Sequence, residues 1–173
     1  MVPVYNTSIC EISCHTANMN TIKTFAKFPL TPFTRLIPAL SSTLLFSLSF
    51  DHAFVTLPPL LELSQESINR SFSSFIQKSL PLLALVTGTT FISGTRAALA
   101  SPSNSWSRFF FAAGTVSLSL RLIGSVLFAR PVQMLMDGEG DTKKNLSHWL
   151  IVQKALAIAD SITVGLFVTA SLK

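Results

Sequence analysis

Four long apolar stretches dominate this chain and restrict its fold more than any other feature. They cover roughly residues 36–57, 79–99, 108–130 and 149–172, and short polar segments separate them. An α-helix rises about 1.5 Å per residue, so about 20 apolar residues cross the ~30 Å hydrocarbon core of a bilayer. The pattern predicts an all-α integral membrane protein in which residues 35–173 form a four-helix transmembrane bundle.

The composition agrees with a membrane protein. The chain is 49% hydrophobic and only 12% charged, which leaves too little polar surface to cover a water-soluble globule of 173 residues. The net charge of +5 comes from basic residues scattered along the chain, with no cluster beyond Lys143-Lys144. We therefore assign this charge to contacts with lipid headgroups and expect no nucleic-acid partner.

Two segments outside the spans have a character of their own. Residues 1–34 hold one acid, Glu11, among lysines, serines and threonines, which is typical of a disordered or targeting tail. Cys10 and Cys14 lie in this tail without the further ligands of a zinc site, and we predict neither a metal nor another cofactor. The segment 60–78 mixes apolar and charged residues and predicts a short amphipathic helix between the first two spans.

Ionisable residues inside the spans are the best guides to function, because a charge in hydrocarbon costs at least ~2.5–3.5 kcal/mol. They are Asp51, His52, Arg121, Lys154 and Asp160. Arg121 and Asp160 both lie about halfway along their spans, so an ion pair between them is the least costly way to bury either charge. Such a pair either fixes the register of two helices or lines a pocket.

Helical spacing predicts which side chains accompany this pair. In the third span, Ser117 shares a helical face with Arg121. In the fourth span, Gln153 and Asp160 share a face, whereas Lys154 points about 100° away from Gln153. The polar face of the third span must turn toward the interior of the bundle.

A pocket at this level would suit acid–base chemistry. His52, Asp51, Lys154 and Gln153 lie close enough along the membrane normal to contribute to it. Histidine is the natural proton acceptor near neutral pH, and a buried lysine or arginine would hold the anion of a phenolic or enolic substrate.

Four segments resemble the DUF1772 family of small four-span membrane proteins, which includes the anthrone oxygenase-like proteins of fungal polyketide pathways. They are "FVTLPPLLEL" (residues 54–63), "SLPLLALVTG" (79–88), "LFARPVQMLM" (127–136) and "HWLIVQKALAIAD" (148–160). The last is the most specific, because the family often shows a tryptophan followed within one or two turns by a basic or histidine residue. Here Trp149 is followed by Gln153 and Lys154, and a His-then-Arg version is absent.

The resemblance implies oxygenation of an anthrone to an anthraquinone by O2, without metal or flavin. The protein would then need only a base, a partner for the oxyanion and an apolar pocket. We assign His52 as the base, Asp51 as the residue that orients it, and Lys154 or Arg121 as the partner of the anion. The residues assigned to binding the hydrophobic substrate are Trp149, Gln153, Asp160 and Ser117.

Two other functions stay open. One is a non-catalytic accessory or assembly subunit, which an exposed small-residue face at Gly88, Gly94 and Ala98 with no pocket behind it would indicate. The other is an isomerase or cyclase of terpenoid or polyketide metabolism that uses the same acid–base residues. We expect the endoplasmic reticulum or another endomembrane, with the mitochondrial inner membrane as the alternative. A homo-oligomer or a pathway enzyme as partner is also open.

Overall fold

The computed structural model describes residues 31–127 and 129–173, and this part of the chain consists of helices joined by short connections, without strands. Most of the predicted tail, including both cysteines, lies outside the described residues. The elements in chain order are α2 (Pro32–Asp51), a π-helical turn η1 (His52–Thr56), a 3-10 turn η2 (Pro58–Glu62), α3 (Gln65–Ala100), α4 (Trp106–Leu127), α5 (Ala129–Asp137) and α6 (Thr142–Ser171).

Four helical segments are long and apolar enough to cross a membrane. They are Pro32–Glu62, Gln65–Ala100, Trp106–Val126 and Thr142–Ser171, with 31, 36, 21 and 30 residues and mean hydropathies of 1.3 to 1.6. Many large apolar side chains on their outer faces are exposed, as a lipid environment requires. The predicted all-α bundle with four apolar spans is therefore confirmed.

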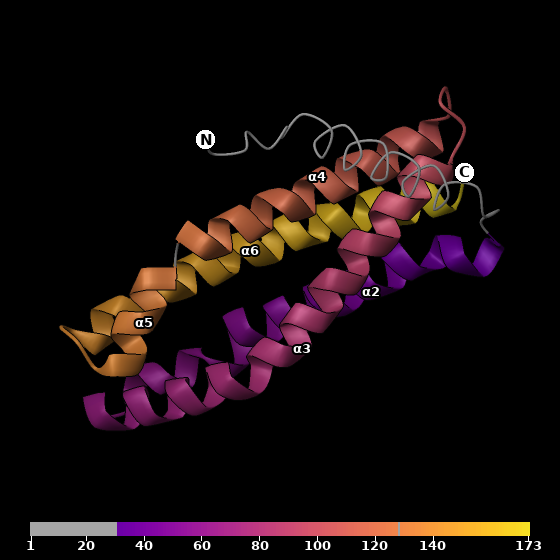
Figure 1. Cartoon of the computed structure of the whole chain (residues 1–173). Coiled ribbons are helices and arrows are strands. Elements are labelled where there is room, and N and C mark those ends of the chain that lie inside the picture. Colours follow the sequence, from indigo (N-terminus) through magenta and orange to yellow (C-terminus); the bar gives the residue numbers. More distant parts are fainter. Residues whose placement is uncertain (1–30, 128) are drawn as a thin grey trace, which may run out of the picture.

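The four long helices form a ring in which each packs against two neighbours (Figure 1). Helix α6 packs mainly against α2 and α4, and α3 completes the ring between the same two helices. The beginning of α2, the α3–α4 connection and the C-terminus gather at one end of the bundle. The short helix α5, η1, η2 and the beginning of α6 gather at the other end.

Polar caps begin three of the helices. The side chains of Thr31, Ser64 and Asp141 accept hydrogen bonds from backbone N–H groups three residues further on, in α2, α3 and α6. Such caps satisfy N–H groups that have no partner within the helix. The helix that begins after Ser64 runs for 36 residues, so it contains both the amphipathic segment and the second span. Residue 79, where we expected the second span to begin, and the nearby Pro81 both lie inside this helix.

The amphipathic segment packs on protein rather than lying alone on the membrane surface. Ile68 and Phe72 of α3 are fully buried in a cluster with Leu135 of α5 and with Leu146 and Trp149 of α6. The third long helix, α4, ends at Leu127, before the end of the predicted span at residue 130, and Arg130 and Pro131 lie in the separate short helix α5. The end of the bundle that holds α5 is thereby tied together by apolar contacts.

Small residues close the opposite end. A Cβ atom on Gly94 of α3 would lie 2.8 Å from Cζ of Phe167, and one on Gly114 of α4 would lie 2.7 Å from Cε1 of the same ring. The ring of Phe167 on α6 fills the space that the two glycines leave, and its side chain is fully buried. Helices α3 and α4 can approach each other at this level because neither glycine has a side chain.

Candidate functional site

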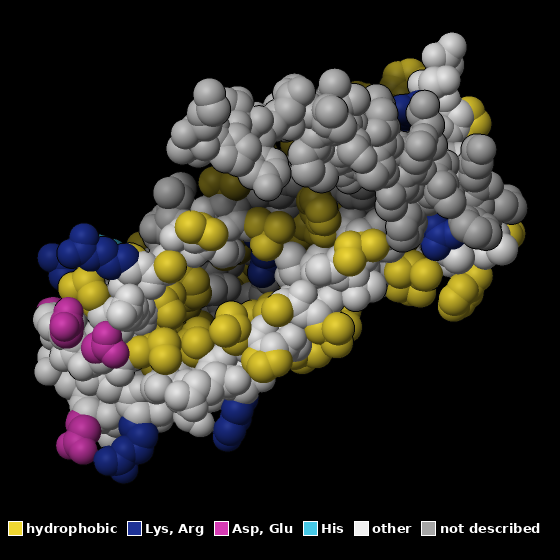
Figure 2. All heavy atoms as spheres, in the orientation of Figure 1, with side chains coloured by type: hydrophobic (Ala, Val, Ile, Leu, Met, Phe, Trp, Pro, Cys, Tyr) yellow, Lys and Arg dark blue, Asp and Glu magenta, His cyan; other side chains and the backbone are white. Residues whose placement is uncertain are grey.

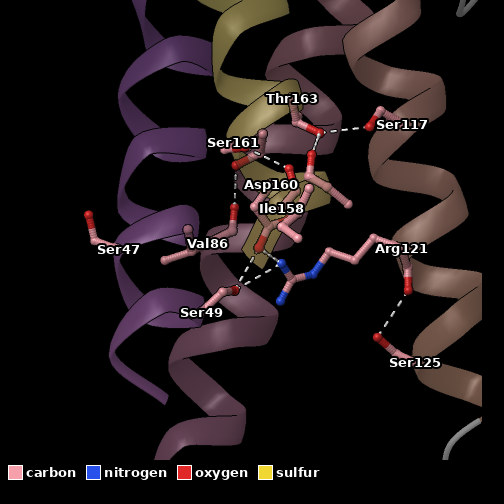
Figure 3. A network of polar contacts seen from close by, with 12 residues as sticks. Ser47, Ser49, Val86, Ser117, Arg121, Ser125, Ile158, Asp160, Ser161 and Thr163 are labelled. Carbon is pink, nitrogen blue, oxygen red and sulfur yellow. Dashed lines mark hydrogen bonds and ion pairs between the residues drawn. The ribbon is translucent and has the colours of Figure 1, made fainter. Parts of the chain in front are cut away.

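A polar network joins three helices inside the bundle (Figure 3). Arg121 reaches from α4 and its Nη1 donates to Oδ2 of Asp160 on α6, which forms the ion pair that the sequence predicted. Ser49 of α2 donates through Oγ to the same carboxylate oxygen at 2.6 Å, and Nη1 of Arg121 lies 3.1 Å from that hydroxyl oxygen. The carboxylate is thus held by one donor from each neighbouring helix.

The network is shielded from solvent. The side chains of Asp160 and Arg121 are only 1% and 9% exposed. Because two opposite charges offset each other, the bundle can hold both groups where either alone would be very costly. Only Nη1 of Arg121 forms hydrogen bonds to side chains of the described residues. The rest of the guanidinium group keeps its donors available.

Arg121 also lines a cavity of about 770 Å³. This volume lies within the range of small-molecule sites, which is roughly 300–1,000 Å³. Hydrophobic side chains from α3, α4, α5 and α6 form most of its wall, and the polar contributors include His52, Thr87, Ser125 and Gln153. Figure 2 shows the molecular surface hollowed between the helices, with hydrophobic side chains around the hollow and basic atoms within it.

The cavity exists because α3 and α4 are in close contact only at the end near Phe167. A Cβ built on Gly94 lies 2.9 Å from Oγ1 of Thr115, so these two positions are level with each other. The two helices are antiparallel, so six residues before Gly94 on α3 corresponds to six residues after Thr115 on α4. Gly88 and Arg121 therefore lie level with each other, about 9 Å along the bundle from this contact. A Cβ on Gly88 would meet no atom within 4 Å. The space beside Gly88 is the cavity itself.

A local irregularity of the backbone places His52 at this cavity. The residue begins the π-helical turn η1, and its carbonyl accepts a hydrogen bond from the N–H of Leu57, five residues on, at 3.3 Å. Pro58 and Pro59 follow and cannot donate backbone N–H groups, so the regular helix ends here. Single π-helical turns occur frequently at functional sites.

The imidazole of His52 has an apolar setting. The side chain is buried and meets the ring of Phe75 edge-on, with the ring centroids 4.6 Å apart. Neither ring nitrogen forms a hydrogen bond to another side chain in the described part of the chain. A ligand in the cavity would therefore find the nitrogens of His52 free to accept or donate a proton.

Two of the residues assigned to substrate binding line the same cavity. Trp149 and Gln153 lie one turn apart on α6, are buried, and contribute to its wall. Asp160 lies two turns further along α6 and does not reach the cavity, but it holds Arg121 in place. Ser117 is also remote, since its hydroxyl pairs with that of Thr163 on α6 at 2.8 Å.

The structure does not bring Asp51 and Lys154 to the cavity. The carboxylate of Asp51 is exposed and accepts a hydrogen bond from the hydroxyl of Thr56 at 2.6 Å, so it does not orient His52. Lys154 is exposed as well, and its Nζ lies 5.6 Å from the ring centroid of Phe54. The exposure of Lys154 beside buried Gln153 agrees with the 100° angle that the sequence predicted.

Sequence reasoning missed Ser49, Thr87 and Phe75. Ser49 is one of several serines in α2, and only the fold shows that it faces the carboxylate of Asp160. Thr87 and Phe75 belong to the part of α3 whose relation to the other spans the sequence left undefined. Thr87 is buried on the same helical face as Thr90 and Gly94. The helical spacing of these three residues is a signal that could have identified Thr87 from the sequence.

Comparisons of the chain with models of protein families, with curated protein sequences and with solved structures gave no match.

Proposed function

We propose that the protein binds an apolar aromatic molecule within the bilayer and removes a proton from it, with His52 as the base and Arg121 as the partner of the resulting oxyanion. The observation that carries this proposal is that one large apolar cavity holds the free imidazole of His52 and the unshared side of the Arg121 guanidinium. The sequence resemblance to anthrone oxygenase-like proteins specifies the reaction as oxidation of an anthrone by O2.

The first step is proton transfer. The methylene hydrogens of an anthrone are acidic because the charge left on carbon spreads onto the carbonyl oxygen. His52 takes one of these protons, and Arg121 donates to the oxygen on which the charge accumulates. Asp160 and Ser49 hold the guanidinium in position through Nη1. Gln153 supplies an amide from the cavity wall for a further hydrogen bond.

The second step uses O2 as the oxidant. The carbanion forms a C–O bond with O2, and the peroxide takes back the proton that His52 holds. Loss of the second methylene proton, with cleavage of the O–O bond, leaves a second carbonyl group and releases water. One anthrone and one O2 thus give one anthraquinone and one water. The apolar cavity suits both reactants, because O2 and aromatic rings each dissolve well in hydrocarbon.

The packing of the second span supports a pocket rather than a surface for a partner subunit. Gly94 packs against Phe167, and Ala98 lies at the edge of the same cluster. Gly88 borders the cavity. The small residues that an accessory subunit would expose are therefore used inside the bundle.

Oxygen uptake tests the proposal. Membranes that contain the full chain are incubated with a panel of anthrones, and oxygen consumption and product mass are followed above the spontaneous rate. We expect catalysed formation of quinone by the wild type, loss of catalysis in His52→Ala, and unchanged catalysis in Lys154→Ala, whose side chain lies outside the cavity. Equal rates in His52→Ala and the wild type would remove His52 from the mechanism.

Turnover of a substrate without oxygen uptake would instead assign the cavity to an isomerase or a cyclase. We propose the endoplasmic reticulum or another endomembrane as the compartment, because apolar polyketides partition into these membranes. The mitochondrial inner membrane is the alternative, and microscopy of a C-terminal fluorescent fusion of the full chain decides between the two.

A further inference from the structure

We propose that the cavity takes its ligand directly from the bilayer, through an opening between α3 and α4–α5, and that this ligand is a single-headed amphiphile with one acidic oxygen. The inference rests on the proposed function for the role of the cavity, but it concerns access and binding rather than turnover.

Two exposed residues of the cavity wall show where the cavity opens. Leu80 of α3 and Leu122 of α4 both line the cavity, yet they are 60% and 42% exposed. The wall between the two helices is therefore open to the outside of the bundle. Large apolar side chains are exposed elsewhere along the same two helices: Leu85, Ile92, Leu120, Ile123 and Val126. Such a surface faces lipid, so the opening does too.

The depth of Arg121 selects the kind of ligand. It lies inside the apolar Trp106–Val126 span, five residues or about 7.5 Å along the helix axis from its nearer end. The bulky headgroup of a phospholipid stays at the membrane surface, and its acyl chains carry no acidic group. A free amphiphile with one carboxyl, phenol or enol group can bring its oxygen to this depth and give the guanidinium a charge-assisted hydrogen bond.

Gly88 determines how much of the opening is available. It lies level with Arg121 across the cavity, and a side chain there would project into empty space. A large residue at position 88 would therefore fill the cavity without displacing the backbone. Gly165 of α6 is a matched control, because it is exposed and a Cβ there also meets nothing within 4 Å.

Fluorescence quenching tests the inference without any turnover. The chain has two tryptophans, and Trp106→Phe leaves Trp149, which lines the cavity, as the single emitter. The full chain in phosphatidylcholine vesicles is titrated with a fatty acid brominated in its chain, with the corresponding brominated alcohol, and with phosphatidylcholine that carries the same brominated chain. Bromine quenches indole only at close range, so it reports occupation of the cavity.

We expect saturable quenching by the fatty acid, at least about tenfold weaker binding of the alcohol because it forms no charge-assisted hydrogen bond, and only non-saturable quenching by the phospholipid. Gly88→Phe should abolish the saturable part, and Gly165→Phe should keep it. The inference is overturned if the phospholipid quenches as the acid does, if the acid shows no saturation, or if Gly88→Phe leaves the acid titration unchanged. Oxygen uptake without saturable quenching would refute this inference alone, and the reverse would refute only the proposed oxygenation.

Discussion

Replacing Asp160 by leucine should destabilise the folded bundle by about 3–5 kcal/mol. The magnitude follows from the surroundings of the pair, since the side chains of Asp160 and Arg121 are 1% and 9% exposed and water cannot screen the charge left behind. Arg121 would remain among apolar side chains without its counter-ion, and the hydroxyl of Ser49 would lose its acceptor. Reversible unfolding by dodecyl sulfate in mixed micelles, followed by circular dichroism, measures this loss.

The double variant separates an electrostatic pair from ordinary packing. Arg121→Met together with Asp160→Leu removes both charges. The free energy of unfolding of this double variant should lie within about 2 kcal/mol of the wild-type value, because apolar replacement of a buried pair is often neutral. Asp51→Leu is the matched control. Its carboxylate is exposed and bonds only to Thr56 among the described residues, so the change should cost less than about 1 kcal/mol. Additive losses in the double variant, or a loss below about 1 kcal/mol in Asp160→Leu, would refute the reasoning.

Three further substitutions can be measured in the same unfolding assay. Gly94→Val should lower the free energy of unfolding by about 1–3 kcal/mol, because the valine side chain would collide with the ring of Phe167. Wild-type stability of this variant would mean that the close contact is absent. Gly88→Ala should be neutral or should stabilise the helix by up to about 1 kcal/mol, since the new methyl group enters open space, and a clear loss would contradict an open cavity. Ser49→Ala should cost about 1–2 kcal/mol by removing a donor to the buried carboxylate, whereas Ser47→Ala, at an exposed position of the same helix, should change little. Equal losses in the two serine variants would argue against the network.

The ion pair could be predicted because it follows from one strong physical constraint. A membrane leaves very few ways to accommodate a buried charge, and the midpoints of neighbouring antiparallel spans lie at the same depth. Arg121 and Asp160 therefore had to find each other, as the structure confirms. Lys154 and Asp51 satisfy the same constraint differently, by lying at exposed positions of their helices. Sequence position alone does not distinguish a residue near the end of a span that turns outward from one that turns inward.

The position and size of the cavity could not be predicted, because they depend on which side chain lies opposite a glycine. Gly88 and Gly94 belong to the same helix and the same pattern of small residues. Gly94 meets Phe167 and closes the bundle, whereas Gly88 meets nothing and leaves it open. This difference arises from how α3 and α4 pack against each other and against Phe167 of α6. It depends on three helices together and cannot be read from one sequence segment.

The continuity of α3 was hidden for a related reason. Pro81 and the change from charged to apolar residues both favour a boundary between an amphipathic helix and a span. Tertiary contacts outweigh that preference, because Ile68 and Phe72 are buried in a cluster that includes Leu146 and Trp149 of α6. The part of α3 that precedes Pro81 also brings the ring of Phe75 edge-on to that of His52.

Hydrogen exchange at the substrate carbon under nitrogen tests the central claim most directly, because it isolates proton removal from the reaction with O2. Membranes containing the full chain are incubated with an anthrone in deuterated buffer without oxygen, and the mass of the recovered anthrone is followed. The account predicts that the wild type accelerates deuterium uptake at the methylene carbon above the spontaneous rate, and that His52→Ala does not. Uptake at the spontaneous rate with the wild type, or equal acceleration by His52→Ala, would contradict it.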